Sequence, residues 1–174
     1  LPIHFAPLQG YTEAIYRNAH DAFFGGVDTY YTPFVRLEKG NFRRRDVRGI
    51  EPENNGVPHL IPQLIASSAE KAEVILSLFI EKGYQEVDIN LGCPFPLLAK
   101  RHNGSGILPY PEEVKALLSI VTRYPQISFS VKMRLGWEQP DECLALAPIL
   151  NDLPLRQITM HPRLGKQGYK GEVD

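Results

Sequence analysis

The most reactive stretch of this chain is residues 90–94, Asn-Leu-Gly-Cys-Pro, which bring an amide, a glycine and a thiol together. Before it, residues 86–91 alternate between polar and apolar side chains, a pattern typical of a short buried strand that runs into a turn. Because α/β proteins keep their chemistry at the carboxyl ends of strands, we expect Asn90 and Cys93 to lie at a functional edge. The alternative is a buried structural cysteine in an ordinary turn.

Cys93 has the chemistry of a proton donor. A thiol of ordinary acidity, with a pKa of about 8.5, is mostly protonated at neutral pH and can deliver its proton. No histidine neighbours Cys93 in the sequence, so the signatures of cysteine hydrolases are absent. The loop at residues 103–106, Asn-Gly-Ser-Gly, carries two glycines, and we expect it to be flexible enough to close over the thiol.

Lys132 and Arg134 alternate along another predicted strand, so their side chains should point to the same side. A lysine at an inward strand position is costly to bury without a partner. We therefore expect the Lys132 amine to be a cation that faces an anionic or electron-rich atom of a ligand. The alternative is a lysine that snorkels to solvent from the strand end.

Two further polar residues lie at the ends of predicted strands. The Gln63 amide can both donate and accept hydrogen bonds, which suits the edge of a heteroaromatic ring, although a turn can also use such an amide. His161 directly follows the last predicted strand and can donate to a bound ring or to a phosphate. A purely structural histidine is the alternative there.

Strands and helices alternate along the whole chain. The strands are expected at residues 1–6, 27–32, 59–65, 87–91, 127–133 and 157–160. Helices are expected after a Thr12 cap, with an apolar stripe at residues 15, 19, 22 and 23, and after a capping box of Ser67 and Glu70, with a stripe at residues 72–79. Two more are expected at residues 114–121 and 141–150, the second with a kink or break at Pro148, before a polar tail from residue 161.

This alternation predicts a parallel sheet with helices outside it. A doubly wound sheet and a (β/α)8 TIM barrel both fit, and the barrel is favoured because polar residues follow nearly every strand and would meet at one mouth. These residues are Gln9, Arg36, Gln63, Asn90, Cys93, Lys132, Arg134, His161 and Arg163. A closed barrel needs about 250 residues, so we expect residues 1–174 to be one α/β domain, an N-terminal fragment with about six of the eight βα units.

Composition limits the partners and the location. The formal net charge is −1, so contact with a nucleic acid needs a local basic surface. Cys93 and Cys143 form neither a disulfide framework nor a metal-ligand pattern, and no long apolar run occurs. We therefore expect a cytoplasmic protein without a metal or a membrane partner. The candidates for a basic surface are Arg43, Arg44, Arg45, Arg48, Lys100, Arg101, His102, Arg163, Lys166 and Lys170, with an ordinary solvated face as the alternative for the arginine run.

Several short motifs follow one another in a fixed order. They are Ala6-Pro7-Leu8-Gln9-Gly10-Tyr11-Thr12, Pro62-Gln63-Leu64, Asp88-Ile89-Asn90-Leu91-Gly92-Cys93-Pro94, Asn103-Gly104-Ser105-Gly106-Ile107-Leu108, Val131-Lys132-Met133-Arg134 and Met160-His161-Pro162-Arg163. In order and wording they resemble the tRNA-dihydrouridine synthases, which are FMN-dependent enzymes on a TIM barrel. The resemblance spans essentially the whole chain. Leu8 and Glu13 depart from it mildly, because the family commonly carries Met and Asp there.

The resemblance implies a flavin site at the barrel mouth. The residues implied to hold FMN are Pro7, Leu8, Gln9, Gln63, Lys132 and His161. Reduced flavin would pass a hydride to C6 of a uracil ring, and NADPH would reload the flavin. Cys93 would then protonate C5 as the general acid.

The substrate implied by the resemblance is a uridine in tRNA. Asn90 and Arg134 would contact the flipped-out uracil or the flavin edge, and the implied RNA contacts are Lys100, Arg101 and Arg163. In the family the loops after the last two strands hold the FMN phosphate, and a further helical domain helps to grip tRNA. Both lie outside this sequence, so we expect the chain alone to be inactive. As a separate expectation, the full-length protein is monomeric.

Two other functions fit the same residues less well. One is a different FMN barrel that acts on a small pyrimidine, as dihydroorotate dehydrogenases do. The other is a non-catalytic RNA-binding fragment with a decayed site. The basic clusters and the Asn-Leu-Gly-Cys-Pro motif disfavour the first, and the joint presence of Gln63, Asn90, Cys93, Lys132 and His161 disfavours the second.

Overall fold

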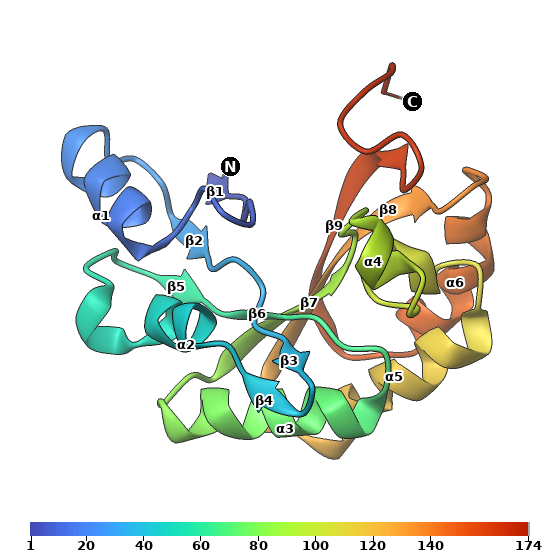
Figure 1. The fold of residues 1–174 in the computed structure, drawn as a ribbon, viewed down its shortest axis with the longest axis horizontal. Coiled ribbons are helices and arrows are strands. Elements are labelled where there is room, and N and C mark those ends of the chain that lie inside the picture. The colour runs from blue at the N-terminus through green and yellow to red at the C-terminus, as the bar shows by residue number, and fades with distance from the viewer. Residues whose placement is uncertain (174) are drawn as a thin grey trace.

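The computed structural model describes residues 1–173 and shows a mixed α/β arrangement (Figure 1). Parallel strands pair in the orders β1-β2-β5 and β6-β7-β8-β9. Their bounds are β1 His4–Phe5, β2 Thr29–Tyr31, β5 Leu60–Ile61, β6 Gln63–Leu64, β7 Glu86–Leu91, β8 Ser128–Gly136 and β9 Leu155–Leu164. A short antiparallel pair, β3 (Leu37–Glu38) and β4 (Asn41–Phe42), follows β2 in the chain.

The two parallel sheets meet at Pro62, which alone separates β5 from β6. Proline has no N–H to donate, which interrupts the ladder, but the Pro62 carbonyl accepts the Asp88 N–H at 3.0 Å. These two short strands therefore occupy the place of the single strand predicted at residues 59–65. Leaving aside the antiparallel pair β3 and β4, each strand of a parallel sheet pairs with the next strand of that sheet along the chain, whereas a doubly wound sheet reverses its order at a switch point. The order favours the barrel-type repeat of the two predicted alternatives.

The α-helices are α1 Ala14–Phe23, α2 Arg44–Ile50, α3 Ala69–Glu81, α4 Pro96–Ala99, α5 Pro111–Arg123 and α6 Glu142–Asn151, with 3-10 turns at Pro52–Asn54 (η1) and Gly104–Ile107 (η2). In the view of Figure 1 the two long helices, α3 and α5, lie below the strands. The predicted apolar stripes of α3 and α5 are confirmed, since Ile75, Phe79, Val114 and Leu118 are all fully buried. They share one core with the strand residues whose side chains point away from the site, among them Ile89.

The apolar stripe predicted for the first helix is wrong in its direction. Ile15 and Phe23 are 83% and 84% exposed, and the buried face is formed by Ala14 and Arg17 instead. Arg17 is fully buried because its guanidinium donates to backbone and side-chain oxygens at Thr12, Gly49 and Asn55. A buried arginine whose two terminal nitrogens are hydrogen-bonded thus decides which face of α1 packs inward.

Several predicted boundaries are also corrected. Thr12 does not cap α1: its hydroxyl accepts the Leu8 N–H at 2.8 Å, and Glu13 takes the N-cap position. Ser68 rather than Ser67 caps α3, by accepting the Lys71 N–H. No break occurs at Pro148, because α6 runs on to Asn151.

The last strand is longer than predicted. Pairing between β8 and β9 continues through Arg134 with His161 and Gly136 with Leu164, so residues 161–164 belong to the strand and not to a polar tail. His161 therefore lies within β9. Among residues 1–173, no helix combines the length and the apolar character that crossing a membrane requires.

Candidate active site

A small cavity of about 60 Å³ opens at the carboxyl ends of β6, β7, β8 and β9. It gathers most of the side chains that the sequence nominated, from five separate segments: Pro7, Gln9, Gln63, Asn90, Cys93, Lys132, Arg134 and His161. The sulfur of Cys93 and the amine-bearing side chain of Lys132 therefore face the same space. Sequence reasoning missed three residues that complete the lining, namely Pro33, Phe34 and Tyr169.

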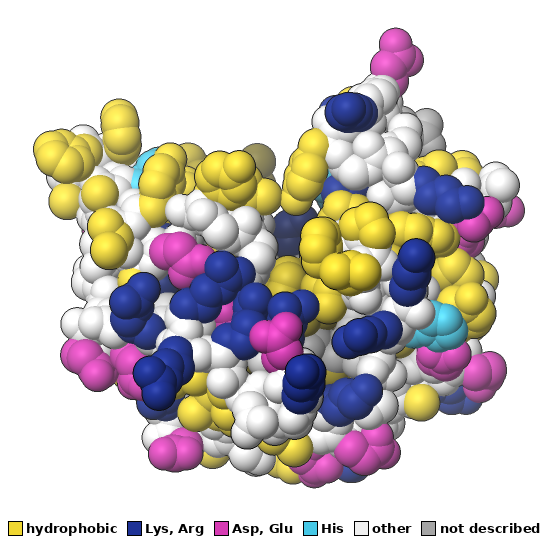
Figure 2. Space-filling view, in the orientation of Figure 1, with side chains coloured by type: hydrophobic (Ala, Val, Ile, Leu, Met, Phe, Trp, Pro, Cys, Tyr) yellow, Lys and Arg dark blue, Asp and Glu magenta, His cyan; other side chains and the backbone are white. Residues whose placement is uncertain are grey.

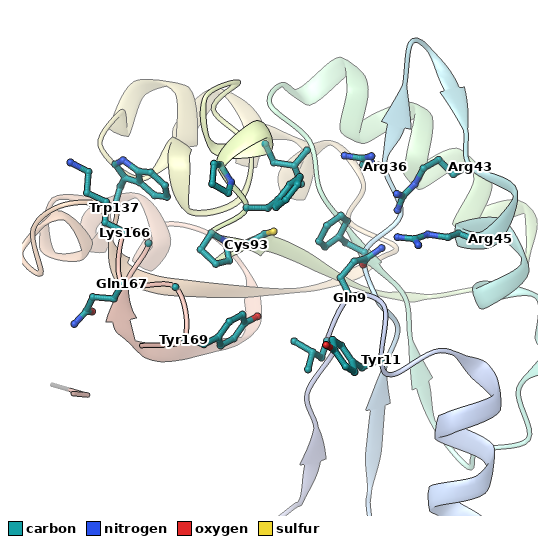
Figure 3. Close-up of a pocket in the computed structure, with 18 residues that line it drawn as sticks. Gln9, Tyr11, Arg36, Arg43, Arg45, Cys93, Trp137, Lys166, Gln167 and Tyr169 are labelled. Carbon is teal, nitrogen blue, oxygen red and sulfur yellow. The ribbon is translucent and has the colours of Figure 1, made fainter. Parts of the chain in front are cut away.

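Four nominated residues lie outside this cavity. Leu8 lines a larger adjoining groove, shown in Figure 3, and Lys100 lies in a separate pocket beside Trp137. Arg101 lies in another pocket, and Arg163 donates to His161 and to the Gly171 carbonyl. For Lys100 and Arg101 the reason is local, because α4 carries the chain away from Cys93 before it reaches them.

A continuous chain of hydrogen bonds lies beneath the cavity and ends at the Cys93 backbone. Ser130 Oγ and Gln63 Nε2 donate to the two carboxylate oxygens of Asp88, at 2.5 and 2.6 Å. Asn90 Nδ2 donates to Gln63 Oε1 at 2.8 Å, and Asn90 Oδ1 accepts the N–H groups of Gly92 and Cys93 at 3.0 and 2.8 Å. We call these four side chains, Ser130, Asp88, Gln63 and Asn90, the buried relay.

Asp88 sets the orientation of the Gln63 and Asn90 amides in the buried relay. Its side chain has only acceptors when ionised, so it holds the Gln63 amide with nitrogen toward Asp88 and oxygen toward Asn90. Asn90 must then present its own oxygen to the Cys93 loop. Burial raises the pKa of Asp88, while its two hydrogen bonds and the nearby Lys132 charge oppose that rise. Nothing in the strand alternation distinguished Asp88 from an ordinary polar residue, so sequence reasoning missed it.

Cys93 is a free, partly buried thiol that lines the cavity and packs against Phe34, Ile65 and Leu98. Burial raises its pKa above the ordinary value, and the Phe95 backbone and the charge of Arg134 only partly offset the rise. The thiol therefore stays protonated at neutral pH. A protonated thiol at a cavity wall can act as an acid, and it is a poor nucleophile.

Lys132 lies one strand away, paired in register with Asn90. Burial lowers the pKa of its amine, and the Asp88 carboxylate partly restores it. Within residues 1–173 no hydrogen bond or ion pair engages the Lys132 amine. A mostly buried cation without a protein partner can serve a ligand that supplies electron density.

His161 is neutral at physiological pH. Its pKa is lowered to about 4, first by burial and then by the charges of Arg134, Lys132 and Arg163. Its Nε2 lies 3.2 Å from Arg163 Nη1, and an arginine can only donate, so Nε2 accepts. The proton of the neutral ring therefore sits on Nδ1, which makes that atom a hydrogen-bond donor.

Arg134 is 1% exposed and binds the protein backbone with most of its donors. Nε donates to the Gly92 carbonyl at 2.9 Å, and Nη1 donates to the carbonyls of Leu164 and Gly168 at 2.9 and 2.7 Å. Its guanidinium also lies 5.5 Å from the centre of the Tyr169 ring. Arg134 thus ties the Cys93 loop to the turn after β9, and contact with a substrate remains a prediction for Nη2 alone.

The glycine-bearing loop is not the mobile cover that the sequence suggested. Residues 104–107 form the buried turn η2, and Ser105 donates through both its backbone N–H and its hydroxyl to the Cys93 carbonyl, each at 3.0 Å. Gly104 has φ +60°, and a Cβ at this position would lie 2.5 Å from the same carbonyl oxygen. The glycine therefore permits close packing under Cys93, and closure over the thiol is excluded by this arrangement.

Gly104→Ala should destabilise the protein strongly. The free energy of unfolding should fall by about 2–5 kcal/mol, because a left-handed backbone costs about 1–2 kcal/mol and an overpacked contact about 1–3 kcal/mol. Urea unfolding measures this change. Gly83→Ala is the control, because Gly83 has φ +85° with no atom near the added Cβ, and it should cost only about 1–2 kcal/mol. Equal losses in the two variants would contradict the packing role of Gly104.

The side chains that line the cavity suit the hydrogen-bonding edge of a flat ring such as the one FMN carries, and a cavity of about 60 Å³ takes only part of such a ring, the rest of which would lie in the larger adjoining groove. Both polar atoms of the Gln9 amide are buried without a hydrogen-bond partner, a state that costs free energy unless a ligand satisfies them. Lys132 and His161 also line this cavity, and each carries a hydrogen-bond donor, the amine of Lys132 and the Nδ1–H of His161. A metal is not indicated, since the described residues contain no group of three or more His, Cys, Asp or Glu side chains placed to hold one.

These features define a parallel α/β protein with a ligand site built from side chains at successive strand ends. The protein-family model described as "Dihydrouridine synthase (Dus)" matches residues 4–174. The chain therefore belongs to the dihydrouridine synthase family.

Curated relatives agree with this assignment. The chain is 29% identical over 97% of its length to "Probable tRNA-dihydrouridine synthase 1" of Synechocystis sp., covering 47% of that protein. It is 28% identical over 98% of its length to "tRNA-dihydrouridine(16) synthase" of Haemophilus ducreyi, covering 54%. It is 32% identical over 65% of its length to "tRNA-dihydrouridine synthase B" of Vibrio cholerae, covering 33%. The chain thus spans about half or less of the length of the curated relatives it matches.

Proposed function

We propose that this chain is part of a cytoplasmic TIM-barrel enzyme that uses FMN and NADPH to reduce uridine to dihydrouridine in tRNA. The observation that carries the proposal is the single cavity that joins the Cys93 thiol, the Lys132 amine and the neutral His161 ring with the Gln9 amide. Membership of the dihydrouridine synthase family supports the choice of reaction. The names of the curated relatives support tRNA as the substrate.

Cys93 is the proposed general acid. When bound, FMN that NADPH has reduced supplies the hydride that adds to C6 of the uracil ring. Cys93 donates its thiol proton to C5, so the C5=C6 double bond becomes a single bond, and the thiolate then regains a proton from solvent. The raised pKa of the thiol keeps that proton on sulfur at neutral pH until it is needed.

The other nominated residues bind and orient. Lys132, Gln9 and the Nδ1–H of His161 donate to the flavin ring, and Pro7 and Leu8 give it an apolar wall. Gln63 hydrogen-bonds to the flavin through the second N–H of its Nε2 or the second lone pair of its Oε1, because the buried relay uses the first of each. The proposed substrate contacts are Asn90 and Nη2 of Arg134 for the uracil, and Lys100, Arg101 and Arg163 for more distant parts of the tRNA.

The experiment for the proposed function is an assay of the whole protein on an unmodified tRNA transcript with FMN and NADPH. Mass spectrometry of the digested RNA should find dihydrouridine, and orotate should remain unchanged under the same conditions. Reduction of orotate, with the tRNA left unmodified, would instead support the enzyme of small pyrimidines.

Lys132→Ala should weaken flavin binding. Loss of a charge-assisted donor should raise the Kd for FMN about tenfold or more, because such a bond contributes about 1.5–3 kcal/mol. Quenching of FMN fluorescence on titration with flavin-free protein measures the Kd. Lys115→Ala is the control, since Lys115 is exposed on α5 and lines none of the site. An FMN Kd equal to that of the wild type would remove Lys132 from the proposed site.

A further inference from the structure

A groove of about 830 Å³ adjoins the small cavity and shares Cys93, Gln9 and Tyr169 with it. Its two long walls differ in chemistry (Figure 3). Arg36, Arg43 and Arg45 point into it from one side, and Trp137 and Tyr169 lie on the opposite side, with Cys93 between them. In the space-filling view, Lys and Arg side chains gather on one side of a hollow and apolar side chains gather on the other (Figure 2).

The basic wall is a local concentration of charge in a chain that is slightly acidic. Residues 36–48 carry six Lys or Arg and two acidic side chains, a net charge of +4, whereas the whole chain has −1. An ordinary solvated run would leave its guanidinium groups in water. Instead, the side chains of Arg36 and Arg43 are only 21% and 19% exposed.

One buried carboxylate fixes Arg43 in place and lies close to Arg45, whose side chain is 50% exposed. Asp46, whose side chain is 3% exposed, accepts from Arg43 at 2.7 and 2.8 Å and lies 3.6 Å from Arg45. Because one carboxylate balances only one guanidinium group, Arg43, Arg45 and Asp46 together keep a net charge of +1. Arg36 pairs with the exposed Glu38 at 3.2 Å, a surface contact that contributes little, and its buried Nε has no partner.

Two of the aromatic rings that line the groove are open to solvent. Tyr11 is 70% exposed and Phe95 is 51% exposed, and both line the groove. Exposed rings next to fixed cations are the combination by which proteins bind single-stranded nucleic acid. The bases stack on the rings, and the guanidinium groups pair with the phosphates.

We propose that this groove binds the phosphodiester strand on one side of the nucleotide that enters the small cavity. Arg36 and Arg45 pair with backbone phosphates, and the bases next to the reacting one stack on Phe95 and Tyr11. The proposal rests on the proposed function for the identity of the strand as RNA, and charge complementarity is the reason for choosing this occupant. The proposal also separates the arginines that take part in binding from those that do not, because the exposed Arg44 and Arg48 do not line the groove.

Charge variants of the whole protein test the basic wall. Arg45→Gln and Arg36→Gln should each raise the Kd for a fluorescein-labelled tRNA transcript about five- to tenfold. Each should also reduce the salt slope of binding by about 0.7, the value for one lost phosphate contact on a single strand. Arg44→Gln is the matched control from the same segment and should stay within about twofold of the wild type. Fluorescence anisotropy at several salt concentrations measures both quantities.

Ring variants and a modified RNA test the other wall and the ligand chemistry. Phe95→Ala should weaken binding about tenfold, whereas Phe23→Ala, on the distant exposed face of α1, should not. An RNA of about seven nucleotides with neutral methylphosphonate linkages should lose most of its affinity for the wild type and a smaller factor for Arg45→Gln, which has one phosphate contact fewer to lose.

The outcomes separate this inference from the proposed function, since anisotropy requires neither flavin nor turnover. Equal effects of Arg44→Gln and Arg45→Gln would show general attraction and overturn the inference. Unchanged RNA affinity with a lowered melting temperature in Arg45→Gln would show that another part of the protein covers the groove, and would overturn it as well. The predicted binding pattern in a whole protein that forms no dihydrouridine with FMN and NADPH would support the groove and count against the enzyme.

Discussion

Cys93→Ala in the whole protein is expected to lower dihydrouridine formation by about 10²–10⁴-fold, the usual contribution of a positioned general acid. Flavin content and NADPH oxidation should persist, because the thiol is assigned to the protonation of C5 and not to holding the cofactor. Product analysis under single-turnover conditions, together with the flavin spectrum, measures the two effects separately.

Cys143→Ala is the matched control for this variant. Cys143 is the other free cysteine, and its thiol donates to the Pro140 carbonyl at 3.1 Å, outside the cavity. The acid role also fixes the pH dependence: burial raises the pKa of Cys93, so the reacting proton is present at neutral pH and is lost only above the ordinary thiol value of about 8.5. Product formation should therefore decline on the alkaline side. Parallel loss of flavin and activity in Cys93→Ala would show that the thiol is structural.

Asp88→Leu is expected to lower product formation by about 10²-fold, even though Asp88 lines neither the cavity nor the groove. Without an acceptor at residue 88, the Gln63 amide is free to turn over, and Asn90 loses the constraint that presents its oxygen to the Cys93 loop. The unpaired Gln63 amide should also cost about 1–3 kcal/mol of stability. Turnover per folded molecule and urea unfolding measure the two consequences.

Asp88→Asn is the conservative variant that identifies the cause. Its oxygen can still accept from Gln63, and its amide can donate to Ser130 Oγ, because a hydroxyl both donates and accepts. We therefore expect Asp88→Asn to restore most of the turnover that Asp88→Leu loses. If Asp88→Asn turned over as slowly as Asp88→Leu, the loss of activity would come from removing the negative charge of Asp88 near Lys132. Full turnover in a destabilised Asp88→Leu would reduce the buried relay to a structural role.

The local patterns of the sequence predicted much of this site. The polar–apolar alternation before Cys93 marks β7, and the stripes at residues 72–79 and 114–121 mark the buried faces of α3 and α5. Because parallel strands in this order bring their carboxyl ends together, polar residues after successive strands converged as expected on one cavity. Such features depend on short periodicities and on strand direction, both of which a sequence carries.

Contacts between distant segments explain what the sequence could not predict. The apolar periodicity of α1 is real, but buried Arg17 and its partners on the segment after α2 decide which face packs inward. Glycines 104 and 106 suggested flexibility, while their actual function is close approach to Cys93 and Ala99. The role of Asp88 could not be predicted, because its partners Gln63 and Ser130 come from the two neighbouring strands.

The most direct test of the proposed flavin enzyme is the visible absorption spectrum of the purified whole protein, recorded before and after addition of NADPH. The cavity that joins Cys93, Lys132, His161 and Gln9 predicts the absorption bands of a bound oxidised flavin, which NADPH should bleach. A colourless protein that forms dihydrouridine in tRNA without added flavin would contradict it.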